Sequence, residues 1–114
     1  MRSPLELNSM SLNPKTERRI SQCIDEVVLE MLGKNGKQTV ARHLLESVGL
    51  KMEEVPLKPE SFREGLEQIF GEEGAEFLET QIVKKLQENL GLQSKSKLTL
   101  VETIQIIKKQ GNSF

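Results

Sequence analysis

The chain has 114 residues, of which 36% are hydrophobic and 29% are charged. This composition is typical of a single globular domain and is too apolar for a wholly disordered chain. The one cysteine excludes an internal disulfide and a cysteine-based zinc site. No apolar run approaches the roughly 18 residues of a membrane span, and the beginning of the sequence lacks the apolar core of a secretory signal. We therefore expect a cytoplasmic protein that makes no membrane contact.

Charge is distributed unevenly along the chain, although the net charge is only −1. Residues 53–80 carry nine acidic and two basic side chains, whereas residues 81–114 carry six lysines and two acidic side chains. Such runs are most often solvent-exposed faces, and they become informative only when a specific partner chemistry matches them.

The N-terminal half of the chain predicts two helices preceded by an arm. Residues 1–13 lack a helical period and are expected to form a flexible arm. An Asn-Pro pair then opens a helix over residues 14–32, and a glycine-containing turn separates it from a second helix over residues 37–48. The positions expected to face the core are Ile20, Ile24, Val27, Met31, Val40, Ala41, Leu44, Leu45 and Val48.

A helical hairpin is predicted to be the centre of the fold. Apolar residues recur at helical spacing on a proline-led helix over residues 59–70 and on a second helix over residues 74–90. Gly71 is expected to end the first helix in the left-handed conformation, with Phe70 before it in the core. So short a link folds the two helices back on one another. The connector residues expected beneath the hairpin are Val55 and Leu57.

A last helix over residues 99–109 is predicted by a capping box, in which Thr99 and Glu102 each satisfy a backbone N–H of the other. Residues 111–114 are expected to fray. No segment alternates apolar and polar residues with a period of two, so no sheet is expected. The predicted fold class is all-α: a single compact domain over residues 14–110, of about five helices, built around the central hairpin.

The spacing of helix ends over residues 33–92 follows a distinctive order. A helix ending in Gly-Leu precedes a short acidic turn, and a proline-led helix ending in Phe-Gly then leads into a long helix that again ends in Gly-Leu. This block, with the closing LTLVETIQIIKK, resembles the archaeal Nitrosopumilus output domain family. The resemblance implies a helical module, attached in some members to signalling proteins, with no established activity and no catalytic residues to carry over.

Residues 33–39, Gly-Lys-Asn-Gly-Lys-Gln-Thr, share only part of a phosphate-binding loop. The full motif has four residues between the glycines, Ser or Thr directly after the lysine, and a preceding strand. What remains is a weaker hypothesis, that Lys34 and Lys37 hold an anion at the amino end of a helix. The alternative is an ordinary turn between two helices.

No group of residues predicts catalysis, a metal or a cofactor. His43, the only histidine, is predicted to lie on the surface, and Cys23 is predicted to be a small buried hydrophobe without a partner base. No feature of the sequence indicates that a carboxylate of residues 53–80 is removed from water, as a general acid or base with a shifted pKa requires. We therefore expect a protein that is not an enzyme, holds no cofactor and takes no small-molecule substrate.

Nucleic-acid binding is an alternative that the basic carboxyl-terminal half leaves open. Lysine without arginine favours contact with phosphates over reading of bases, and no aromatic residue other than Phe is present to stack on bases. The candidate residues are Lys84, Lys85, Lys95, Lys97, Lys108 and Lys109.

Three large apolar residues point away from the apolar stripes of their own helices. At 100° per residue, Leu29 and Phe77 lie about 160° from their stripes and Ile106 lies about 120° from its stripe. Either neighbouring segments cover them, or they form a surface that meets another chain. The favoured function is a small helical protein-interaction module, an adaptor or signalling output, with a protein partner or a second copy bound at these residues.

Overall fold

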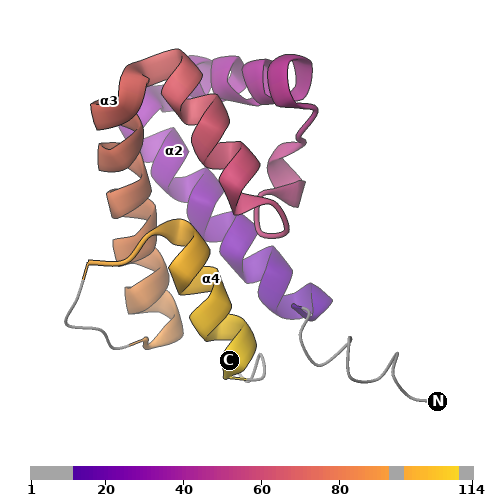
Figure 1. Cartoon of the computed structure of the whole chain (residues 1–114), viewed down its shortest axis with the longest axis vertical. Helices are drawn as coiled ribbons and strands as arrows, with labels where there is room; N and C mark the ends of the chain where they lie inside the picture. The colour runs from indigo at the N-terminus through magenta and orange to yellow at the C-terminus, as the bar shows by residue number, and fades with distance from the viewer. Residues whose placement is uncertain (1–11, 93–96, 111–114) are drawn as a thin grey trace.

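The computed structural model describes residues 12–92 and 97–110, which are mostly helical and contain no strand (Figure 1). The all-α class is therefore confirmed for this part of the chain. In chain order its elements are α2 (Pro14–His43), the π-helical turn η1 (Leu44–Val48), the 3-10 turn η2 (Met52–Glu54), α3 (Pro59–Leu90) and α4 (Leu100–Lys109). Of the predicted arm and tail, residues 1–11 and 111–114 lie outside the described residues, and Leu12 is buried.

The described residues form three α-helices, so the predicted number of about five is wrong. The reason is that two predicted breaks are kinks of a single residue within longer helices. Gly33 in α2 has φ 76° and ψ 176°, and Gly71 in α3 has φ 80° and ψ 175°. The positive φ predicted for Gly71 is present, but its ψ is extended instead of the roughly 47° of a left-handed cap. This combination of φ and ψ is open essentially to glycine alone.

Both kinks are built in the same way. A Cβ added at Gly36 would lie 2.6 Å from the Cβ of Leu32, and a Cβ added at Gly74 would lie 2.8 Å from the Cβ of Phe70. In each case a second glycine, three residues after the first, leaves room for the side chain that precedes the kink. We call residues 33–36 the α2 kink and residues 71–74 the α3 kink.

The kinks wrap the helices around one core. In Figure 1, α3 rises to its kink and then descends, so that its two segments fold back as the predicted hairpin, with α4 beside them. Gly65 lets the first segment of α3 approach η1 closely, since a Cβ there would lie 2.3 Å from Cδ2 of Leu44. Large side chains that are almost fully buried include Phe62, Ile20, Ile24, Leu44, Leu50, Leu66, Ile82, Leu86, Leu100, Ile104 and Ile107.

Several apolar residues assigned to the core are exposed instead. Phe70 directly precedes the α3 kink and Met31 lies two residues before Gly33, close to points where the phase of a regular helix no longer predicts which way a side chain points. Leu45 lies in the π-helical turn η1, whose spacing differs from 3.6 residues, and Leu57 lies in the turn before α3. Buried positions predicted correctly include Cys23 and Val55.

An ion pair joins the two segments of α3 across its kink. Arg63 donates from Nη1 to Oε1 of Glu79 at 2.8 Å and from Nε to Oε2 of Glu67 at 2.9 Å. The Glu79 side chain is only 7% exposed, whereas that of Glu67 is 43% exposed. A carboxylate removed from water in this way needs a charged, hydrogen-bonded partner, so Arg63 is what makes its burial tolerable.

Replacing Gly71 with Ala is expected to lower the free energy of unfolding by about 1–3 kcal/mol, because a side chain is strained at this φ and ψ. No atom lies within 4 Å of the added Cβ, so the loss reports backbone strain alone. Chemical denaturation measures it, with Glu72→Ala as the control in the adjoining helical turn. Equal stability of the two variants would contradict the kink geometry.

Replacing Arg63 with Ala is expected to cost about 3 kcal/mol of stability, because it leaves Glu79 buried without a partner. The double variant Arg63→Met/Glu79→Met removes both charges and is expected to recover most of that loss. Glu67→Gln changes the exposed partner of the same arginine and serves as the control with a small effect. A double variant as unstable as Arg63→Ala would show that the charge pair itself, and not an orphaned carboxylate, carries the stability.

Candidate protein-interaction surface

Two of the three predicted interface residues are exposed. The exposed fraction is 46% for Leu29 and 57% for Phe77. Ile106 does not share this property, because it is partly buried and packs against the core. The broad apolar face of α4 is pressed into the core through Ile104 and Ile107, and Ile106 lies at its edge. The interface role of all three residues stays a prediction.

Exposed aromatic side chains gather beside the α3 kink. Phe70 is 38% exposed and lies against Gly74, as its Cβ position shows. Phe77 follows Gly74 by three residues and therefore lies one turn further along the same helix face. Gly74 has no side chain, and this leaves room for the Phe70 side chain beside it. We call Phe70, Gly74 and Phe77 the α3-kink surface.

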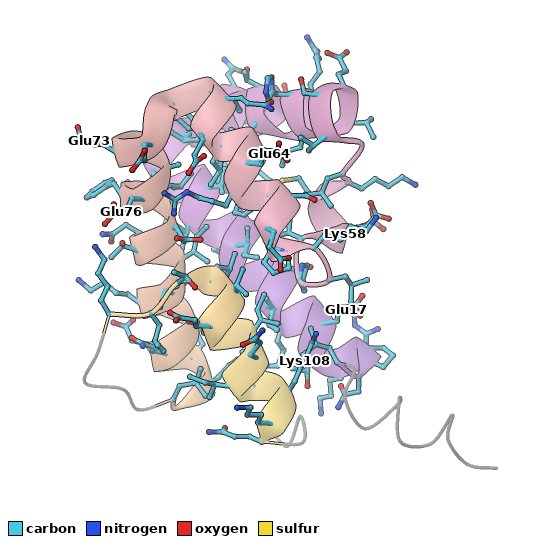
Figure 2. All side chains as sticks on the ribbon, viewed as in Figure 1. Glu17, Lys58, Glu64, Glu73, Glu76 and Lys108 are labelled. Carbon is cyan, nitrogen blue, oxygen red and sulfur yellow. The ribbon has the colours of Figure 1, made fainter. Side chains whose placement is uncertain are left out.

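Carboxylates border the α3-kink surface. Glu72 and Glu73 are exposed, and neither makes an ion pair with any residue of the described ranges. Glu76 accepts a hydrogen bond from Nζ of Lys97 at 2.6 Å, and this bond and the lysine charge lower the pKa of the Glu76 carboxyl. Figure 2 shows Glu73 and Glu76 on the outer side of α3. The surface thus has an aromatic centre and an acidic border.

The α2 kink lines a hollow of different character. Its volume is about 390 Å³, and its mostly apolar wall is formed by Leu29, Lys34, Lys37, Gln38 and Ala41. Nζ of Lys37 lies 3.8 Å from a carboxylate oxygen of Asp25, and Lys34 makes no ion pair within the described residues. The structure therefore brings the two predicted anion-binding lysines together, but around an apolar wall rather than a polar cradle. We call this the α2-kink hollow.

The predicted nucleic-acid residues do not form one uniformly basic face. Lys85 lies 3.4 Å from Glu26 and 3.7 Å from Glu30, and Lys97 is held by Glu76. Lys84 shares a hollow with Lys85, Glu30 and Glu88.

The remaining candidate lysines lie apart from these. Lys108 and Lys109 are in the last turn of α4, and Figure 2 shows Lys108 far from Glu76. Lys95 lies outside the described residues. Partial burial by itself lowers the pKa of Lys85, but the carboxylates of Glu26 and Glu30 outweigh it, so that the pKa is raised and the ammonium stays charged.

The residues weighed for chemistry have structural partners. His43 is only partly exposed, because its Nε2 bonds with Oε1 of Gln68 at 2.8 Å and links α2 to α3. Cys23 is buried and accepts a hydrogen bond from Nδ2 of Asn89 at 3.0 Å. Among the described residues, no three His, Cys, Asp or Glu side chains gather as a metal site requires. Within the same ranges, no helix combines the length and the apolar character needed to cross a membrane.

The molecule is thus an all-helical domain whose two long helices are kinked at glycines. A family model described as Nitrosopumilus output domain 5 matches residues 22–109, and the chain belongs to this family. This confirms the resemblance seen over residues 33–92 and in the closing residues 98–109, and it extends the match toward the N-terminus to residue 22. No curated protein and no solved structure matches the chain.

Sequence reasoning missed Phe70 and the hollow around Leu29. The available signal was a repeated pattern, Leu-Gly-Lys-Asn-Gly at residues 32–36 and Phe-Gly-Glu-Glu-Gly at residues 70–74. Only the structure shows that both copies form the same backbone kink.

Proposed function

We propose that this domain is a small protein-interaction module, acting as an adaptor or signalling output, that binds its partner through the α3-kink surface and catalyses no reaction. The observation that carries the proposal is the exposure of Phe70 and Phe77 on either side of Gly74. Aromatic residues are enriched at the anchoring positions of interfaces, because a rigid ring buries much area at little cost in side-chain entropy.

The charged residues that border this surface support the same proposed function. A typical interface has an apolar centre and a polar rim that stays in contact with water. Glu72, Glu73 and Glu76 supply such a rim, and the first two have no ion-pair partner within the described residues. A single exposed Phe needs no explanation, but two beside one glycine form a surface that an incoming chain can cover.

Replacing Phe77 with Ser is expected to abolish partner binding while changing the free energy of unfolding by only about 0.5 kcal/mol, since the ring is mostly exposed. The wild type and the variant would each be used to capture proteins, after nuclease treatment, from an extract of the organism that encodes the chain. Proteins retained by the wild type should be absent from the variant.

Leu57→Ser is the matched control for this experiment. Leu57 is 52% exposed, close to the 57% of Phe77, and it lies at the opposite end of the first segment of α3 from the kink. The control is expected to capture the same proteins as the wild type. Capture that is unchanged by Phe77→Ser, or a variant that unfolds readily, would contradict the assignment of this surface.

Nucleic-acid binding is the alternative that the lysines of residues 81–114 favour, and the ion pairs of Lys85 and Lys97 with carboxylates count against it. We expect no retardation of labelled DNA or RNA at about 50 mM salt, where contacts to phosphates are strong. Binding that weakens steeply with salt, and that is further reduced by Lys84→Ala or Lys108→Ala, would instead establish this function.

A further inference from the structure

The two kinks repeat one backbone conformation with opposite charge. Gly33 and Gly71 agree within a few degrees in φ and ψ, and each is followed by a second glycine three residues later. Lysines surround the first kink, at positions 34 and 37, whereas glutamates surround the second, at positions 72 and 73. The same turn therefore presents a basic surface on α2 and an acidic surface on α3.

From this we infer that the partner of the α3-kink surface is a second copy of this chain, bound through its α2-kink hollow. The inference rests on the proposed function and names the partner of the same surface. Of the two surfaces, one offers aromatic side chains that project into solvent, and the other offers an apolar recess.

The recess is large enough for the projecting side chain. The hollow measures about 390 Å³, and a cavity of about 150 Å³ in a protein interior already holds a benzene molecule. Leu29 and Ala41 supply apolar contacts for a phenyl ring, and the 46% exposure of Leu29 leaves this contact area open. Seating Phe77 against Leu29 would remove from water the two residues whose exposure the helix patterns do not explain.

The charges around the two surfaces are complementary. Lys34 makes no ion pair within the described residues, and the ion pair of Lys37 with Asp25 is long, at 3.8 Å. Glu72 and Glu73 likewise make none there. Opposite charges on the two rims favour this pairing over contact between two like kinks, where charges of one sign would meet. The net charge of −1 adds little long-range repulsion between copies.

The proposed contact is heterologous, because it joins two different surfaces of the same chain. A copy that has lost the α3-kink surface still carries an intact hollow, and a copy that has lost the hollow still carries intact phenylalanines. Two defective variants therefore complement each other in a mixture, which a contact between identical surfaces would not allow.

The test is sedimentation velocity of the full chain at concentrations up to about 500 µM, because so small a contact is expected to be weak. The wild type should form dimers and larger species at about 50 mM salt and should dissociate at about 500 mM salt, where surface charges are screened. Phe77→Ser and Leu29→Ser should each be monomeric with an unchanged circular dichroism spectrum. Their equimolar mixture should form a dimer that grows no further, and Leu57→Ser should behave as the wild type.

Charge-reversal variants distinguish this specific pairing from nonspecific association. Lys34→Glu/Lys37→Glu and Glu72→Lys/Glu73→Lys should each weaken association at least about tenfold, and combining all four substitutions in one chain should restore it. A wild type that is monomeric at every concentration overturns the second-copy inference. So does a mixture of the two serine variants that stays monomeric. Neither result affects the proposed function, which is tested separately by whether Phe77→Ser loses the proteins that the wild type captures while remaining folded.

Discussion

At Gly71 the backbone turns through a φ of 80° and a ψ of 175°, and the return of the second segment of α3 alongside the first depends on this one residue. A straight helix of the 32 residues in α3 would be about 48 Å long, more than the 45 Å of the molecule's longest dimension. The kink instead returns the second segment alongside the first. Arg63 can then reach Glu79, sixteen residues later in the chain, and cover a carboxylate that has almost no contact with water.

The same constraint determines which apolar side chains are left outside. A residue that flanks the kink cannot follow the apolar stripe of either segment, because the helical phase changes there. Phe70 is placed in this way over Gly74, and Met31 is left exposed near the equivalent kink of α2. The surfaces that we propose for binding therefore result from the same glycine kinks that fold the helices around the core. Their opposite charges are a property of sequence alone, since the two backbones are alike.

Local rules predicted several helix ends well, although not the kinks at Gly33 and Gly71, because each of these ends depends on residues that are close in sequence. Asn13 accepts the N–H of Thr16 at the start of α2, and Thr99 and Glu102 form the expected capping box of α4. Gly49 and Gly91 end their helices with φ near 65°. Each of these outcomes needs only a few neighbouring residues, so a single sequence is sufficient.

The remaining features depend on contacts that no local rule contains. The partner of Arg63 lies on another segment, and the sequence around Glu79 does not mark it as buried. The Leu29 hollow exists only because the second segment of α2 leaves its kink in a particular direction. The partial burial of Ile106 was not predictable for a similar reason, since the angle around one helix says nothing about how deeply that helix packs into the core. Membership of the family could be read from the order of capped helices, whereas the binding surfaces required the fold.

The reversal of α3 at Gly71 is the central claim, and proton NMR of the isotopically labelled chain tests it most directly. Nuclear Overhauser effects between the side-chain protons of Arg63 and those of Glu79 are expected, because their polar atoms lie 2.8 Å apart. In an unbroken helix these residues would be separated by about 24 Å along the axis, too far for any through-space effect. Their absence, together with an unbroken series of helical sequential contacts through Gly71, would contradict the kinked fold and the surfaces derived from it.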